Sequence, residues 1–102
     1  MKDIVITEKQ IYLNTYWQNR LIGLLGDIEN IKVIKPAEVR KYLDEIIQKT
    51  KRIILIPTNY LALQKFRWVV KLIYYCGMLA TDKDFEKEIY IWEPQERRFV
   101  KI

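Results

Sequence analysis

The chain has 102 residues, half of them apolar and 30% charged, a balance typical of one globular domain. Its 18 Lys and Arg against 13 Asp and Glu give a net charge of +5, which favours polyanions but does not diagnose nucleic-acid binding. It has no His, no Ser, one Cys and three Gly, which excludes Ser–His and Cys–His nucleophiles, zinc sites and glycine-rich phosphate loops. We therefore expect a non-enzymatic protein with no cofactor and no metal.

The first half of the chain predicts two strands and two helices in alternation. Residues 3–7 form a β-branched run typical of a strand, and residues 31–34 predict a second one. Between them, apolar residues three and four apart predict a helix over about residues 10–25, ended by Gly26. Pro36 then opens a helix, because a missing N–H is harmless in the first turn. The apolar stripes of these helices are Leu13, Trp17, Leu21, Leu24 and Leu25, and Val39, Tyr42, Leu43 and Ile46.

The second half predicts a strand, a long helix and another strand. Residues 52–57 contain four consecutive aliphatic residues, which indicates a strand buried on both faces. Residues 60–79 predict a helix, residues 88–93 a strand, and a basic tail with Arg97, Arg98 and Lys101 follows Pro94. The helix has an apolar face of Ala62, Phe66, Val69, Val70, Ile73 and Cys76, and an opposite face of Gln64, Arg67, Lys71 and Tyr75.

Cysteine usage and hydropathy indicate an intracellular protein. The single Cys76 cannot form an intramolecular disulfide, and its place on an apolar face predicts a small core residue. The opening MKDIVITEK lacks the apolar region of a signal peptide. The longest uncharged stretch in the most apolar segment, residues 72–80, is shorter than the roughly 20 residues that a membrane-spanning helix needs.

The two halves resemble each other, which predicts an internal repeat of about residues 1–50 and 51–102 in one domain, 1–102. Residues 31–40 align with 89–98 through matching Ile, Pro, Glu and Arg, and residues 17–26 align with 68–77 through matching Trp, Leu, Ile and Gly. We expect an α/β (or α+β) fold: a four-stranded sheet with packed helices, built from two β-α-β motifs related by a pseudo-twofold. The seam between the motifs is a natural groove.

An Ile-, Tyr- and Lys-rich chain without His or Ser, with two similar β-α-β halves, resembles the small proteins encoded by filamentous viruses of hyperthermophilic archaea. The resemblance rests on composition, length and repeat, and covers the whole chain. It implies a viral protein in the cytoplasm of a hot archaeal host and carries over no catalytic residue.

Aromatic residues in the second half favour a protein- or peptide-binding module. In a strand over 88–93, Tyr90 and Trp92 would share one face, and an extended peptide could bind along this aromatic edge or in the groove between the motifs. Trp68 and Tyr75 are further candidates for partner binding. The simpler interpretation is that Tyr90 and Trp92 fill a core, and that Trp17 and Trp68 anchor their helices in it.

Nucleic-acid binding is the alternative. Lys65, Arg67 and Lys71 lie on the polar side of the long helix, and Arg97, Arg98 and Lys101 in the tail could join them on phosphates while Trp68 or Tyr75 stacks. Against this, basic residues are spread through both halves and acidic residues cluster at 82–88. A solvated helix face explains the same charges.

Two further possibilities concern the acidic cluster and self-association. An enzyme is the third possibility, with a metal-dependent phosphoryl site formed by Asp82, Asp84, Glu86 and Glu88. Their spacing imitates the start of a calcium loop, but lysines interleave and the loop's glycine and distal glutamate are absent, so a solvated loop is the favoured interpretation. An uncovered edge strand could pair with its own copy, so both a monomer and a homodimer stay open.

Overall fold

A computed structural model describes residues 3–8, 14–57, 60–81 and 87–102 of the chain. In chain order its elements are β1 (Asp3–Thr7), α1 (Thr15–Leu25), β2 (Ile31–Ile34), the 3-10 turn η2 (Pro36–Glu38), α2 (Leu43–Lys49), β3 (Arg52–Ile56), α3 (Tyr60–Thr81), β4 (Glu88–Glu93) and β5 (Arg98–Lys101). This is a mixed α/β fold, as the alternating pattern predicts.

One sheet of five strands, in the order β2-β1-β3-β4-β5, runs through the described chain. The first four strands are parallel, and β5 is antiparallel to β4. The prediction of four strands is therefore wrong in number, because the basic tail after Pro94 turns back and pairs. Arg97 has φ 52 in that turn, and Phe99 and Val100 lie between the charged residues that begin and end the strand.

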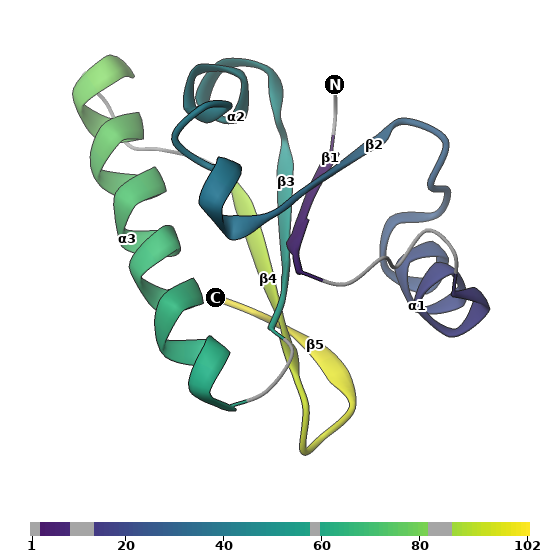
Figure 1. Cartoon of the computed structure of the whole chain (residues 1–102). Helices are drawn as coiled ribbons and strands as arrows, with labels where there is room; N and C mark the ends of the chain where they lie inside the picture. Colours follow the sequence, from purple (N-terminus) through teal and green to yellow (C-terminus); the bar gives the residue numbers. More distant parts are fainter. Residues whose placement is uncertain (1–2, 9–13, 58–59, 82–86) are drawn as a thin grey trace.

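Helices cover both faces of the sheet, with α1 on one side and α3 on the other (Figure 1). On the α1 side, Trp17, Leu21 and Leu25 pack on Val5, Ile54, Ile56 and Trp92. On the α3 side, Phe66, Val69 and Ile73 pack with Val39 and Ile46 on Ile4, Ile6, Ile53, Leu55 and Ile89. The aliphatic run of β3 thus contacts helices on both faces, as predicted.

The ends of α1 follow from local chemistry. The Asn14 side chain accepts a hydrogen bond from the Tyr16 N–H at 2.9 Å and caps the helix at its start. Gly26 ends it with φ 91, a left-handed conformation that glycine adopts without strain, and its N–H donates to the Ile22 carbonyl at 2.8 Å. The predicted end of this helix is confirmed; the predicted start at about residue 10 lies outside the described residues.

The helix predicted from Pro36 is divided in two. Pro36 does open a helical turn, and Glu38 Oε1 accepts from the Lys35 N–H at 3.0 Å, but this turn is the short η2 and α2 begins only at Leu43. The predicted core stripe is confirmed, since Val39 and Ile46 are buried and Tyr42 and Leu43 pack against them.

The two tryptophans aligned by the repeat lie in different surroundings. Trp17 is 7% exposed and anchors α1, whereas Trp68 is 50% exposed. The prediction that both are core anchors is confirmed for Trp17 and wrong for Trp68. The core stripe of α3 is Phe66, Val69 and Ile73, and a residue two positions after Phe66 lies on the opposite side of a helix.

Candidate functional site

The strand predicted to present an aromatic edge is inside the sheet. β4 pairs with β3 on one side and with β5 on the other, so it offers no free backbone to a peptide. Trp92 is only 6% exposed, and its ring lies 4.7 Å from that of Trp17 and 5.1 Å from that of Phe99, between centroids. Tyr90 is half-buried. The hypothesis of an aromatic strand edge is therefore wrong, and the simpler interpretation of Trp92 as a core residue is confirmed.

The seam between the two halves is the line along which β1 and β3 pair. Its residues from Ile4 to Ile6 and from Ile53 to Ile56 are fully buried. The hollows described below are lined by neither strand. The groove predicted at the seam is thus filled by side chains where the structure describes it, and the candidate site is elsewhere.

A hollow of about 570 Å³ lies between α3 and the last two strands. Its floor is apolar, formed by Ile91 of β4 and by Ile102, which follows β5. Gln64, Arg67 and Lys71 line it from the exposed side of α3, together with Trp68 and Val70. The C-terminal end of the chain lies beside α3 in Figure 1, in agreement with the place of Ile102 among the residues that line this hollow.

A second hollow, of about 710 Å³, shares Gln64, Arg67 and Glu93 with the first. It extends toward the β4–β5 turn past Val100, which pairs with Ile91 across the strands, and past Arg98, which pairs with Glu93. We call the two together the α3–β5 groove. Its walls are α3 and the turn, and its floor consists of the side chains of β4 and β5 that face α3. The floor is apolar at Ile91 and Val100, with Ile102 beside them, and charged nearer the turn, at Glu93 and Arg98.

The topology explains why this floor is open. Strands β1 to β4 are joined by helical crossovers, each of which lays a helix on the sheet. β5 follows β4 through a short turn and adds no helix of its own. The crossover helices therefore cover the strands β1 to β4, and β5 extends the sheet beyond them.

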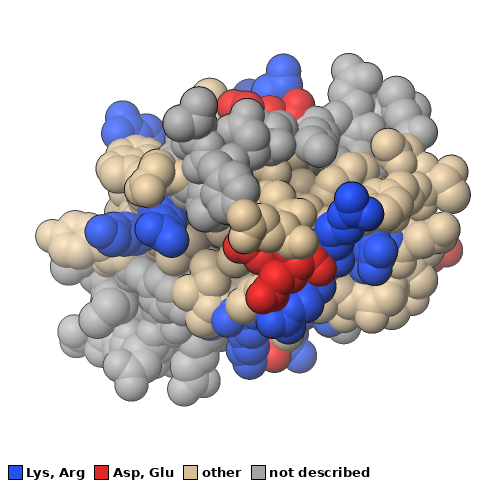
Figure 2. Space-filling model, turned by 90° about the horizontal axis from the view of Figure 1, so that it is seen from below, with Lys and Arg blue, Asp and Glu red and all other residues tan. Residues whose placement is uncertain are grey.

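Charges around the groove are of both signs. Arg98 Nε lies 2.7 Å from Glu96 Oε2, and Glu93 Oε1 accepts from the Gln95 N–H at 3.1 Å. Figure 2, a view of the end of the molecule that holds the β4–β5 turn, shows carboxylates surrounded by Lys and Arg. Arg67 and Lys71 are exposed and form no ion pair with any residue that the structure describes.

The predicted site residues are thus only partly brought together. Trp68, Arg67, Lys71 and Arg98 line one groove, although they come from two separate predictions. Tyr75, 66% exposed, and Arg97, exposed in the turn, are not among the described lining residues. The side chain of Lys65 lies outside the described part of the chain, as do Asp82, Asp84 and Glu86. Cys76 is half-buried on α3.

Trp68 lines the groove and also contacts Arg40, which lies between η2 and α2. The guanidinium carbon of Arg40 lies 5.4 Å from the centroid of its ring, within the range of a cation–π contact. The indole remains half-exposed despite this contact.

Sequence reasoning missed the residues on the other side of the hairpin. There, a hollow of about 300 Å³ lies beside Arg20, Gly23, Trp92 and Phe99. The Arg20 guanidinium carbon lies 5.1 Å from the Tyr16 ring centroid and 5.9 Å from that of Trp92. The apolar pair Phe99 and Val100 was the only signal of a strand here, and a segment of four residues with two charges is equally typical of a tail.

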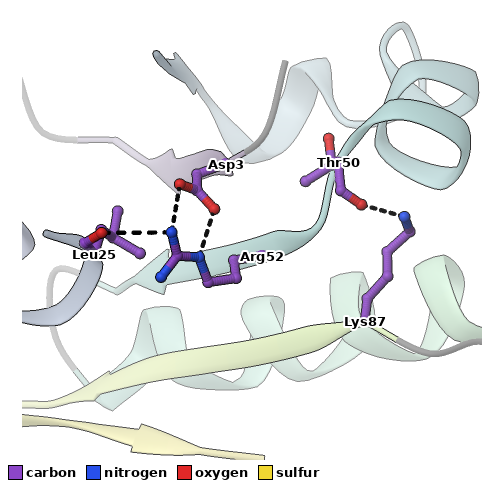
Figure 3. Close-up of polar contacts among 5 residues, drawn as sticks. All are labelled: Asp3, Leu25, Thr50, Arg52 and Lys87. Atoms are coloured by element: carbon purple, nitrogen blue, oxygen red, sulfur yellow. Dashed lines mark hydrogen bonds and ion pairs between the residues drawn. The ribbon is translucent and has the colours of Figure 1, made fainter. Parts of the chain in front are cut away.

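Polar contacts at the amino ends of the strands tie the sheet together (Figure 3). Arg52 donates to both carboxylate oxygens of Asp3, at 2.8 and 3.1 Å, and to the Leu25 carbonyl at 3.5 Å. The hydrogen bond to Asp3 raises the pKa of Arg52. Lys87 donates to the Thr50 carbonyl, and burial lowers the pKa of its ammonium group. Because these groups satisfy one another, they serve the fold and present no reactive group.

Metal clusters and membrane spans are two further kinds of site. In the described ranges, no three or more Cys, Asp or Glu side chains gather as a metal site would require, and no helix is both long and apolar enough to cross a membrane.

No protein-family model matches the chain, and comparisons with curated proteins and with solved structures find no match.

Proposed function

We propose that this protein is a non-enzymatic binding module that holds a segment of another protein in the α3–β5 groove. The observation that carries the proposal is an apolar floor of Ile91, Val100 and Ile102 beside a half-exposed tryptophan, Trp68. Apolar floors rimmed by polar groups are typical of protein interfaces, and Trp and Arg are the side chains most enriched at their energetic centres.

Nucleic acid is the second candidate occupant of the same groove. Arg67, Lys71 and Arg98 line it, and an exposed indole can stack on a base. Two features favour protein instead: Glu93 lies in the groove itself, and the charge of Arg98 is compensated by Glu96. A phosphate chain along this groove would pass carboxylates that repel it.

The wider setting follows from the sequence. Composition, length and repeat support an origin in a filamentous virus of a hyperthermophilic archaeon, with action in the host cytoplasm. The partner would then be a viral or host protein.

We propose that the two halves are related by a pseudo-twofold that runs along the strands between β1 and β3, and the pairing of the strands supports this. Ile4 pairs with Lys32 and Ile54 with Tyr90, so residues 50 apart in β1 and β3 have partners 58 apart in β2 and β4. Under that offset Ile31 and Val33, on the α1 side, match Ile89 and Ile91, on the α3 side. A twofold axis parallel to the strands exchanges the two faces of the sheet. The helix of the first motif, α1, therefore lies on one face, and the helix of the second motif, α3, lies on the other.

Selection from a random peptide library displayed on phage tests the function. We expect peptides selected on the wild-type protein to lose at least tenfold in affinity for Val100→Glu, which puts a carboxylate on the groove floor. Ile22→Glu is the matched control, because Ile22 is an exposed aliphatic residue on α1, away from the groove.

Two outcomes would overturn the proposal. Peptides that bind both variants as well as wild type would not use the groove. Fluorescence anisotropy with labelled single- and double-stranded DNA is the parallel measurement: micromolar binding that weakens steeply with salt and is lost in Arg67→Glu would assign the groove to nucleic acid.

A further inference from the structure

The floor of the α3–β5 groove is a piece of sheet face over which no helix lies in the described part of the chain. In α/β folds the faces of a parallel sheet are covered by helices, because each exposed face is apolar. Here α3 covers the neighbouring strands, while Val100 and Ile102, at the end of the chain, remain half-exposed or exposed beside it. If β4 were followed by another helical crossover, as the earlier strands are, the helix of that crossover could lie where the groove is.

Backbone hydrogen bonding decides between an extended and a helical occupant. The backbone of β4 is paired with β3 and β5. The Ile102 N–H donates to the Ile89 carbonyl at 2.9 Å, and alternation along an antiparallel ladder directs the backbone groups of Val100 toward β4 as well. The outward groups are then those of Phe99 and Lys101, at the outer edge of the sheet and not in the groove.

An extended segment in the groove would thus find no ladder to join. Its N–H and C=O groups would lie unpaired over Ile91 and Val100, and each one shielded from water would lose hydrogen bonds that nothing in the groove replaces. A helix satisfies its backbone internally and offers only side chains to the floor. The geometry of the groove therefore favours a helix.

Charge identifies the side chains along that helix. Arg67 and Lys71 are four residues apart, so they project from one line along the wall formed by α3, and neither has an ion-pair partner among the described residues. Away from this wall, at the end of the groove near the β4–β5 turn, lie Glu93 and the paired Glu96 and Arg98. Acidic side chains on the flank toward α3 would complement the two cations, Arg67 and Lys71.

We propose that the occupant is an amphipathic helix of another protein, with its apolar face on the groove floor and acidic residues against Arg67 and Lys71. This inference rests on the proposed function and specifies the partner. A second copy of the chain fits poorly: α1 and α3 contain no acidic residue, and α2, with Asp44 and Glu45, has only seven residues.

Synthetic helices test the inference with the full chain. The probes are two lactam-stapled peptides of about five turns with the same leucine face, one with glutamates and one with lysines along the flank. The readout is the methyl NMR shift of Ile91, Val100 and Ile102. We expect saturable shifts from the acidic peptide and about tenfold weaker binding of the basic one. The double variant Arg67→Glu/Lys71→Glu reverses this preference.

A third, unstapled acidic peptide with a central proline cannot be helical and serves as the control. If it binds as well as the stapled one, the helix inference fails while the proposed function stands. If neither stapled peptide shifts the methyl signals although library peptides do bind, the helix inference likewise fails and the proposed function stands. Shifts that depend on protein concentration alone would assign the groove to a second copy, and competition by a single-stranded oligonucleotide would assign it to nucleic acid, which would also end the proposed function.

Discussion

The two faces of the β4–β5 hairpin differ in how they are covered. On the α1 side, Trp92 and Phe99 are cross-strand neighbours, Trp92 contacts Trp17, and the aromatic rings reduce the space beside the helix to a hollow of about 300 Å³. On the α3 side, the equivalent neighbours Ile91 and Val100 lie on the floor of a groove. The same two strands thus serve as core on one face and as candidate interface on the other, and large aromatic side chains make the difference because they span the distance that smaller residues leave open.

The largest expected effect is on the covered face. Trp92→Ala should lower the free energy of unfolding by about 3–5 kcal/mol, because it removes a buried ring that three other aromatic residues contact. Trp68→Ala, which removes a half-exposed ring, should lower it by less than about 1 kcal/mol. Urea denaturation followed by circular dichroism measures both. Equal losses would mean that the groove side is packed as tightly as the aromatic side.

Adjacent residues of β5 give the most direct comparison of the faces. Phe99→Glu puts a carboxylate against Trp92 and should destabilise the protein by about 2–3 kcal/mol. In Val100→Glu the new carboxylate points into the groove. This variant should lower the free energy of unfolding by less than about 1 kcal/mol, while it weakens peptide binding there at least tenfold. Thermal unfolding of the two variants decides the matter. The reverse order of stabilities would contradict the assignment of the faces.

The sequence predicts the covered side of this comparison well. Trp17, Leu21 and Leu25 recur every four residues, and Ile53 to Ile56 form an unbroken aliphatic run. Such patterns reflect local periodicity, which does not depend on how the remaining chain is arranged. The helix α1 and the central strand β3 can therefore be predicted from the amino-acid sequence alone.

The α3 side of the hairpin depends on contacts between distant residues, which the periodicity of the sequence does not predict. β5 has four residues, two of them charged, and becomes a strand only because Pro94 and the left-handed Arg97 turn the chain back on β4. Once β5 pairs, β4 is no longer an edge, and Trp92 is buried while Trp68 is exposed. The topology of the sheet thus decides that Trp92 is not available to a partner, whereas Trp68 is exposed because it lies on the side of α3 opposite the core stripe. The exposed helix face identifies the basic residues Arg67 and Lys71, but it does not predict the groove beside them.

The polar end of the sheet offers a comparison of intermediate size. Asp3→Asn leaves the shape of the side chain but removes the charge that faces Arg52, whose own side chain is 18% exposed. We expect the free energy of unfolding to fall by about 2–3 kcal/mol. This is less than the largest losses that follow when a fully buried ion pair is broken, because Arg52 keeps some contact with water. Glu96→Gln breaks an ion pair whose partners are both more than half exposed, and should cost less than about 0.5 kcal/mol. Similar losses in urea titrations would show that burial does not set the strength of these pairs.

The smallest expected effect tests whether the lesser hollow on the α1 side is only imperfect packing. Gly23 lies inside α1, and a Cβ built there meets no atom within 4 Å. Gly23→Ala should therefore stabilise the protein by about 0.5–1 kcal/mol through helix propensity, without change in peptide binding at the α3–β5 groove. Gly26→Ala is the matched control, because φ 91 makes any side chain there unfavourable by about 1 kcal/mol. If Gly23→Ala instead weakened peptide binding, the hollow beside Trp92 and Phe99 would belong to the interface, and the contrast between the two faces of the hairpin would not hold.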